Sequence, residues 1–137
     1  GRRAVIVLDT HVLVWLDADS ADLGAEAARL IDDEFAHDGV VVSAISFWEI
    51  AMLVSKERLE VGKPLAQWRK ELLSAGLKEL PVDGGLGIEA VGLPGFHGDP
   101  ADRLIVATTL MSGCRLLTAD REILGWQGGL EALDARV

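Results

Sequence analysis

The sequence predicts a three-layer α/β/α domain with a mostly parallel central sheet, and three observations support this fold class. Short β-branched runs alternate along the chain with longer segments of helical periodicity. The first run is apolar at every position, as expected of a strand that is covered on both faces. The length of 137 residues fits one sizeable core without a linker or internal repeat, so we expect residues 1–137 to form a single domain.

Five segments are predicted strands. Ala4–Leu8 (AVIVL) and Val40–Val42 are continuous apolar runs, and Arg115–Thr118 (RLLT) follows a strong helical segment. A shorter candidate lies at Glu79–Val82, and the tail Leu130–Val137 is expected to add an edge strand. Because these strands alternate with helices, most of them are expected to run parallel.

Helices are predicted between the strands from their periodicity and their end signals. Ser20 is the candidate N-cap of a helix over Asp22–Ala36, and Asp99 is a cap directly before a helix over Pro100–Met111. The segment Ile45–Ser55 is apolar almost all round, so its helix is expected to be buried. The remaining predicted helices span Thr10–Leu16, Pro64–Gly76, Leu86–Val91 and a short segment after Asp120.

Composition limits the classes of function that fit this chain. There are 13 Lys plus Arg against 22 Asp plus Glu, whereas a nonspecific grip on nucleic acid needs a basic surface. Between Lys56 and Lys78 six basic residues stand against three acidic ones, which fits either a solvated helix face or an RNA backbone contact. Cys114 is the single cysteine, and neither a signal peptide nor a membrane span is evident, so we expect a cytoplasmic protein with no membrane association.

Four acids fall where an open parallel sheet binds its ligands, beyond the carboxyl ends of strands and at nearby helices. Asp9 follows the first strand and Asp120 follows the RLLT strand, although Asp before a helix is also a favoured N-cap. Glu49 lies in the apolar helix, where it must be neutralised, paired with a cation such as Lys56, or bound to metal. Asp102 occupies the third helical position, either as a capping-box acid or as a side chain that projects toward a cation.

Taken together, the four carboxylates indicate a metal site. Hard oxygen ligands without a Cys or His cluster favour Mg²⁺ or Mn²⁺ over zinc. Metals held in this way activate water and stabilise the leaving oxygen in phosphodiester hydrolysis. The acidic excess fits this site, and it also fits a basic protein partner.

Other polar and aromatic residues near these acids have two interpretations each. His11 and His97 lie beside site acids and are candidates for proton transfer, although a structural hydrogen bond is the more common role of a histidine. Arg103 fits a structural partner of a nearby acid as well as a phosphate contact. Base stacking and the more common core or interface role both fit three tryptophans: Trp15, Trp48 and Trp68.

Four motif-bearing stretches, in this order along the chain, resemble a known family. They are VIVLDTHVLVW (its core at 6–15), SAISFWEIAML (43–53), LPGFHGDPADRLIVATTL (93–110) and LLTADREI (116–123). Their combination resembles the PIN-domain ribonucleases, specifically the VapC-type toxins of type II toxin–antitoxin pairs. The resemblance implies a PIN-like fold and an Mg²⁺- or Mn²⁺-dependent endoribonuclease that hydrolyses RNA and inhibits translation. It also implies a homodimer and a cognate antitoxin whose basic residues occupy the acidic groove.

The resemblance also assigns roles to individual residues. It implies that the catalytic acids are Asp9, Glu49, Asp102 and Asp120. Asp9, Asp102 and Asp120 would hold the metal, while Glu49 completes or orients the ligand shell. Hydroxyl-bearing residues match family positions near the site and are predicted to contact the substrate: Thr10, Ser43, Ser46 and Thr118.

Three other classes remain for comparison. A response-regulator domain needs paired acids after its first strand and a lysine after its last, yet no lysine follows Lys78. A haloacid-dehalogenase-type phosphatase needs a second acid where His11 stands. The alternative that stays open is a noncatalytic acidic module that binds a basic protein, which would tolerate the loss of any one carboxylate.

Overall fold

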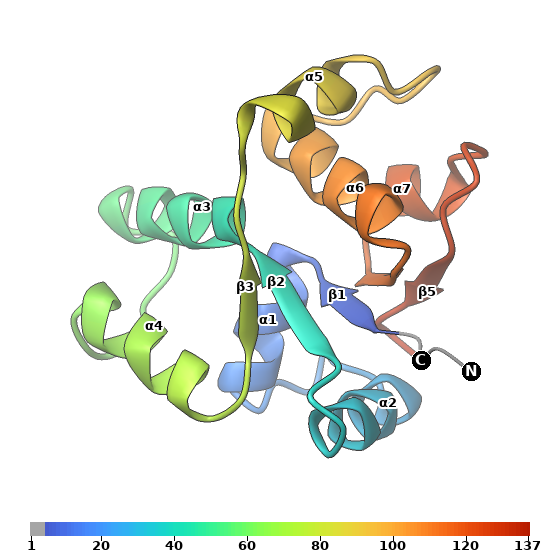
Figure 1. Cartoon of the computed structure of the whole chain (residues 1–137). Helices are drawn as coiled ribbons and strands as arrows, with labels where there is room; N and C mark the ends of the chain where they lie inside the picture. The colour runs from blue at the N-terminus through green and yellow to red at the C-terminus, as the bar shows by residue number, and fades with distance from the viewer. Residues whose placement is uncertain (1–4) are drawn as a thin grey trace.

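A five-stranded parallel sheet forms the centre of the computed structural model, which describes residues 5–137 (Figure 1). The strand order is β3-β2-β1-β4-β5, and every neighbouring pair is parallel. Ala4, where the first predicted strand begins, lies outside the described residues. The strands are β1 (Ile6–Leu8), β2 (Val40–Ser43), β3 (Lys78–Leu80), β4 (Arg115–Thr118) and β5 (Ala132–Asp134).

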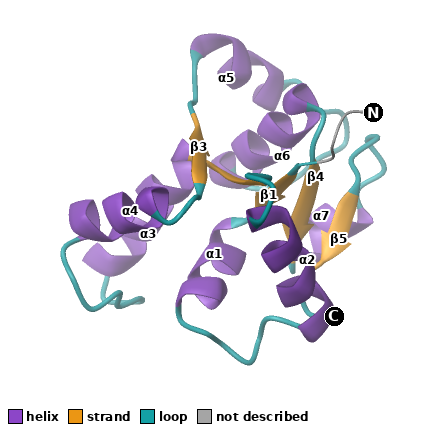
Figure 2. Cartoon of the chain, turned by 60° about the horizontal axis from the view of Figure 1, so that its bottom comes forward, coloured by secondary structure: helices purple, strands orange, loops and turns teal. Residues whose placement is uncertain are grey.

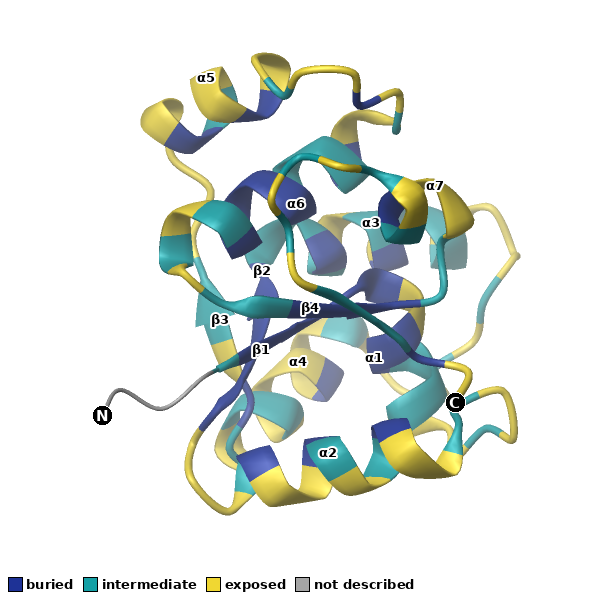
Figure 3. Cartoon of the chain, turned by 90° about the vertical axis from the view of Figure 1, so that its right-hand side faces the viewer, coloured by how far each residue is buried: buried dark blue, intermediate teal, exposed yellow. Residues whose placement is uncertain are grey.

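Helices cover both faces of this sheet (Figure 2). They are α1 (Thr10–Asp17), α2 (Ala25–Phe35), α3 (Ala44–Ser55), α4 (Leu65–Ser74), α5 (Gly84–Val91), α6 (Pro100–Ser112) and α7 (Arg121–Gly125). Because side chains alternate along a strand, Ile6 of β1 joins one core with Ile31 of α2, while Val7 joins another with Ile105 of α6. Helices α2 and α6 accordingly lie on opposite sides of the sheet (Figure 3). The predicted three-layer α/β/α fold is confirmed.

Tight connections between strands and helices determine where the polar residues lie. Asp9 separates β1 from α1 and caps that helix, and Ser43 at the end of β2 caps α3. Asp99 and Asp120 cap α6 and α7 in the same way. Because parallel strands all end at one edge of the sheet, these junctions bring several capping side chains to that edge.

The start of α2 differs from the sequence prediction. Its N-cap is Gly24 rather than Ser20, whose hydroxyl accepts only a local hydrogen bond from the Asp22 N–H at 3.1 Å. The C-terminal tail is the reason, because the Gly24 N–H donates to the Ala135 carbonyl at 2.9 Å. This contact joins residues more than a hundred positions apart, which local propensity does not encode.

The expectation that the apolar helix is buried was wrong. Within α3 only Ser46 and Ile50 are buried, and Trp48 is 52% exposed. The helix packs against α1, α6 and β2 and leaves its remaining surface uncovered. The strand predicted at Glu79–Val82 has different bounds in the structure. Strand β3 ends at Leu80, which forms the last pair with β2 at Ser43, so Val82 lies beyond the sheet.

The described helices also bear on membrane association. In residues 5–137 no helix combines the length and the apolar character needed to cross a bilayer.

Candidate active site

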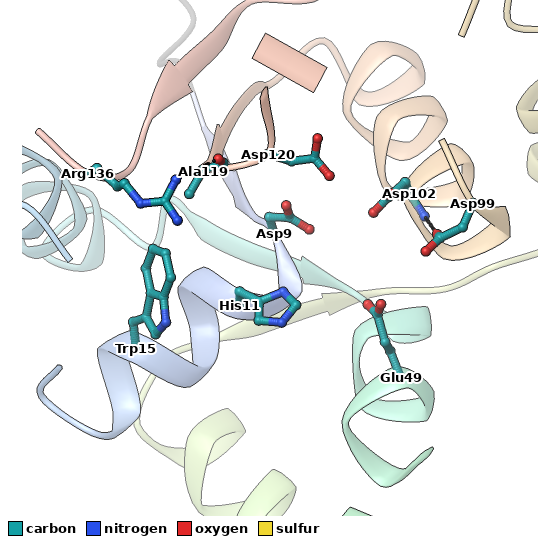
Figure 4. A pocket seen from close by; sticks show the side chains of 9 residues that line it. All are labelled: Asp9, His11, Trp15, Glu49, Asp99, Asp102, Ala119, Asp120 and Arg136. Atoms are coloured by element: carbon teal, nitrogen blue, oxygen red, sulfur yellow. Dashed lines mark hydrogen bonds between the residues drawn. The ribbon is translucent and has the colours of Figure 1, made fainter. Parts of the chain in front are cut away.

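All four predicted acids lie around one pocket at the carboxyl edge of the sheet. Leu8 pairs with Val42 on one side and with Leu117 on the other, so the residues that follow these strands are neighbours in space. Strands β2 and β3 extend the sheet on one side of β1, and β4 and β5 extend it on the other, so β1 is the topological switch point. Open α/β sheets form their binding crevice at this point. The pocket has a volume of about 320 Å³ and is lined by Asp9, His11, Trp15, Glu49, Asp99, Asp102, Ala119, Asp120 and Arg136 (Figure 4).

Asp9 is held at the base of the pocket by hydrogen bonds to both of its carboxylate oxygens. Oδ1 accepts from the Thr10 N–H at 2.8 Å, and Oδ2 accepts from the Thr118 hydroxyl at 2.6 Å. The side chain is 6% exposed, and this burial raises its pKa, an effect that the two hydrogen bonds partly oppose. Asp9 is therefore an N-cap and a site residue at once, so the two interpretations are not exclusive.

Asp120 uses one oxygen for structure and leaves the other available. Its Oδ1 accepts from the N–H groups of Glu122 at 2.8 Å and Ile123 at 3.3 Å, as an N-cap does. The Thr118 hydroxyl accepts from the Asp120 N–H at 3.0 Å, which links this acid to Asp9 through one threonine. The carboxylate faces the pocket across from Asp9 (Figure 4).

Glu49 extends from α3 toward the same space (Figure 4). Its Oε1 is buried and has no hydrogen-bond partner among residues 5–137. Burial raises the pKa of Glu49, the nearby Thr10 hydroxyl opposes this shift in part, and the negative charges of Asp9 and Asp99 add to it. The structural alternative, an ion pair with Lys56, was wrong, because in the described chain Glu49 has no such pair.

Asp102 lies at the third position of α6 without forming a capping box. Its backbone N–H donates to Asp99 Oδ1 at 2.8 Å, but no described group donates to its own carboxylate. Burial is the main cause that raises its pKa to about 7, followed by the charge of Asp99 and then those of the other pocket acids. The carboxylate therefore projects into the pocket, as the second interpretation of Asp102 predicted.

Asp99 is a pocket acid that the sequence analysis treated only as a helix cap. It does cap α6, yet its side chain also lines the pocket beside Asp102 and Glu49 (Figure 4). The signal was present in the spacing, since residues three apart in a first helical turn share a face. Because Asp before a helix is such a common N-cap, Asp99 was not considered as a pocket acid from the sequence.

The four predicted hydroxyl residues are buried behind the pocket and do not line it. The Thr10 hydroxyl donates to the Ser46 hydroxyl at 2.9 Å, and Ser43 accepts from the Ile45 N–H at 3.2 Å as the cap of α3. With Thr118 on Asp9, these contacts support the acids and their helices. Direct contact between these hydroxyls and a substrate stays a prediction.

The other polar candidates separate into those that reach the pocket and those that do not. His11 lines it, whereas His97 lies in a different depression near Phe96. Arg103 pairs with no acid among the described residues and instead donates to the carbonyls of Ala90 at 3.3 Å and Phe96 at 2.6 Å, while its phosphate contact stays a prediction. These bonds fasten the loop after α5 to α6.

The basic segment between α3 and β3 lies outside the pocket lining. Lys63 pairs with Glu71 at 3.1 Å, and Arg69 pairs with Glu79 at 2.7 Å. These exposed pairs favour the solvated-face interpretation of the segment.

The tryptophans have three different environments. Trp68 is 3% exposed and donates to Asp17 at 2.9 Å, which is a core role, while Trp48 is largely exposed on α3. Trp15 lines the pocket together with Arg136, whose guanidinium carbon lies 5.5 Å from the centre of the Trp15 ring. Arg136 is the residue for which the sequence offered no local signal.

The donor set of the pocket fits a divalent cation. Five carboxylates line the pocket, and one of their oxygens is buried without a donor. Burial and the charges of the neighbouring acids raise the pKa of Asp102 to about 7. Across residues 5–137, however, no three His, Cys, Asp or Glu side chains are close enough to form a ready ligand group. The chemistry of the donors therefore fits the ion, while the side chains would have to draw together around it.

Comparison with known proteins identifies the family. A family model described as the PIN domain matches residues 6–124. This chain belongs to the PIN-domain family. Its relative Ribonuclease VapC22 of Mycobacterium tuberculosis (strain ATCC 25618 / H37Rv) is 36% identical over 119 residues, which cover 86% of this chain and 88% of the relative. The resemblance predicted from the four motif-bearing stretches is confirmed.

Solved structures of VapBC complexes contain chains with the same fold. VapBC2 from Rickettsia felis, bound to a DNA fragment from its promoter, matches with a TM-score of 0.71 at 15% identity over 95% of this chain and 98% of that chain. DNA-bound VapBC from Salmonella typhimurium matches with a TM-score of 0.69 at 16% identity over 96% of this chain and 98% of that chain. At these identities the likeness concerns the fold, and it confirms the predicted PIN-like architecture.

Proposed function

We propose that this PIN-domain protein is an Mg²⁺- or Mn²⁺-dependent endoribonuclease. The observation that carries the proposal is the set of five carboxylates in one pocket, on Asp9, Glu49, Asp99, Asp102 and Asp120, with an orphaned buried oxygen on Glu49. A purely structural acid in such a place would have a cationic partner. The ribonuclease named among its relatives supports RNA as the substrate class.

Asp9, Asp102 and Asp120 would hold the metal, with Glu49 completing the shell. When bound, the ion supplies Lewis-acid stabilisation of the charge that develops on the phosphate. Asp9 is already oriented for this role, because its two oxygens accept from Thr10 and Thr118.

The residues of the chain would divide the remaining work of hydrolysis. The oxygen of a water molecule attacks phosphorus, the bond from phosphorus to the leaving oxygen breaks, and that oxygen takes a proton. The buried Glu49 Oε1 is available to accept the proton of the attacking water, because no hydrogen bond occupies it and burial raises the pKa of the side chain. The N–H groups of Glu122 and Ile123 hold Asp120 Oδ1, which leaves the other carboxylate oxygen to turn toward the ion.

The biological setting that we propose is that of a toxin. A toxin–antitoxin complex from Klebsiella pneumoniae is among its structural neighbours, which supports a cognate antitoxin for this chain. A basic segment of such a partner would complement the acidic pocket. Cleavage of RNA would then inhibit translation when the antitoxin is absent. A single cysteine without an internal partner is compatible with a reducing cytoplasm.

A homodimer is part of the same proposal. Large apolar side chains are exposed on α5 and at the end of α6: Ile88 is 76% exposed, Val91 79% and Met111 58%. Exposed apolar groups of this size on neighbouring elements favour burial against another protein surface.

The first experiment is thermal unfolding of the protein and of Asp9→Asn over a Mn²⁺ titration. A saturable rise in the wild-type midpoint that is absent from the variant is expected, because ligand binding stabilises only the state that holds the site. Cleavage of a labelled pool of single-stranded RNA in Mn²⁺ then tests the reaction itself. No rise and no cleavage at millimolar Mn²⁺ would favour the noncatalytic acidic module instead.

A further inference from the structure

Arg136 lies in the acidic pocket but pairs with none of its acids. Its Nη1 donates to the Ala119 carbonyl at 3.1 Å, and its guanidinium lies over the Trp15 ring. It is the only Lys or Arg among the nine lining residues. Within residues 5–137 it forms no ion pair, and its Nε and Nη2 donate to no acceptor. On this exposed side chain, these donors face solvent and are accessible to a ligand that enters the pocket.

The pocket consequently has two chemically different ends. Asp9 and Asp120 lie in the middle, with Asp102 and Glu49 on one side and Arg136 on the other (Figure 4). An RNA strand that crosses the pocket carries a charge on every phosphate, and the carboxylates repel each of them. A fixed cation at one end offsets this repulsion for a phosphate beside the one that is cut, because a guanidinium fork matches phosphate oxygens.

Arg136 is exposed, but the backbone around it is held in place and its guanidinium contacts the Ala119 carbonyl and the Trp15 ring. The Ala135 carbonyl accepts from Gly24, and the Val137 carbonyl accepts from the Glu26 N–H at 2.9 Å. The Arg136 N–H donates to Asp134 Oδ1 at 2.9 Å. A Cβ on Gly24 would lie 2.6 Å from the Arg136 carbonyl, so only glycine permits this approach. Contacts that order a side chain before binding lower the entropic cost of the contact it makes.

We propose that Arg136, stacked on Trp15, binds a phosphate of the RNA strand next to the scissile one and so sets the position of the strand. This assignment rests on the proposed ribonuclease function and names a binding residue for it.

RNA affinity in the Asp102→Asn background tests the assignment, because that background is expected to bind without cutting. The probe is a fluorescein-labelled 20-nucleotide single-stranded RNA pool of randomised sequence, and the readout is anisotropy in Mn²⁺ at several salt concentrations. Adding Arg136→Gln should weaken binding on the order of tenfold. It should also reduce the slope of log affinity against log salt by about 0.7, the value of one lost phosphate contact on a single strand.

The matched control is Arg29→Gln, which removes the same charge from an exposed position on α2 outside the pocket. It should leave affinity and slope unchanged. Arg136→Lys keeps the charge but loses the fork, so it should keep the slope and recover only part of the affinity. Thermal unfolding of each variant checks that the fold is retained.

The outcomes separate this assignment from the function on which it rests. Equal affinity and slope for Arg136→Gln and its parent would overturn the assignment and leave the ribonuclease intact. Equal weakening by Arg29→Gln would replace a phosphate site by a general charge effect. If the parent binds no RNA and wild type shows neither a Mn²⁺ response nor cleavage, the function itself has failed and the assignment falls with it.

Discussion

The two ends of the central sheet differ in whether their buried acids have a cationic partner. At the amino end of β4, Arg115 pairs with Glu34 of α2 at 3.3 Å, and Glu34 is 3% exposed. At the carboxyl end, five carboxylates share a pocket with Arg136, yet no ion pair forms between them and Glu49 Oε1 has no donor. In the first arrangement the buried acid has a cationic partner within the fold, although Arg115 Nε itself makes no hydrogen bond among the described residues. In the second, the acids have no such partner and leave charge for an external ligand to satisfy.

The largest effect expected from this difference is on catalysis. Asp9→Asn should lower kcat/KM for RNA cleavage by roughly 10²- to 10³-fold or more, because it removes a charge aimed at the reacting centre. Cleavage of the labelled RNA pool in Mn²⁺ measures this effect. Asp19→Asn is the matched control, since Asp19 is exposed, lies outside the pocket and already has the positive φ that Asn tolerates. Full activity of the Asp9 variant would remove this acid from the site.

Stability should respond in opposite directions at the two ends. Glu34→Gln leaves Arg115 with only the exposed Glu131 at 3.5 Å as an acidic partner. It should lower the free energy of unfolding by about 2–3 kcal/mol, less than for a fully buried pair because Arg115 is 24% exposed and keeps this second partner. Glu49→Gln removes an unsatisfied charge and should change stability by less than ~1 kcal/mol, or increase it, when a chelator removes metal. Urea unfolding of both variants measures the contrast. Equal losses would mean that Glu49 is also a structural acid.

The pH dependence sharpens the comparison. The pKa of Asp102 is about 7 in the folded chain and starts from 3.8. Between these values the folded state binds more protons than the unfolded state, so this group stabilises the fold as the pH falls. In chelator, the free energy of unfolding should therefore decrease as the pH rises from about 4 to about 7. The decrease should be on the order of 2 kcal/mol, because one pKa unit is about 1.4 kcal/mol and solvent screens this half-buried carboxylate in part.

Asp102→Asn is the control for this pH effect. It should flatten the pH dependence, abolish cleavage, and at about pH 8 in chelator be as stable as wild type or more stable. A loss well above ~1 kcal/mol would instead mean that Asp102 acts chiefly in the first turn of α6.

The smallest effect concerns the tail that holds Arg136. In Gly24→Ala the new Cβ would lie 2.2 Å from the Val137 carbonyl carbon, so the tail must shift, at a cost of about 1 kcal/mol. Thermal unfolding measures the loss. Gly87→Ala in α5 is the control, because nothing lies within 4 Å of its Cβ and alanine favours a helix. If the two variants unfolded alike, the tail would not need the close approach at Gly24.

Much of the fold was predictable because it depends on local signals. Apolar runs and caps placed all five strands and six of the helices to within a few residues, and the missed start of α2 came from a contact with the distant tail. The four acids were predictable because strand ends and helix starts are visible in sequence. Asp99 was hidden behind its capping role, and the exposure of Trp48 depended on how α3 packs.

The sequence by itself determined the α/β/α class, the family motifs and which acids follow which elements, because each depends on residues close together along the chain. Only the tertiary structure decided that Glu49 has no partner, that Thr118 orients Asp9, and that Arg136 enters an acidic pocket. These facts depend on parallel register and on a tail docked against α2, which bring together residues far apart along the chain. The charge balance in the pocket therefore depends on the tertiary structure and not on any one segment of the sequence.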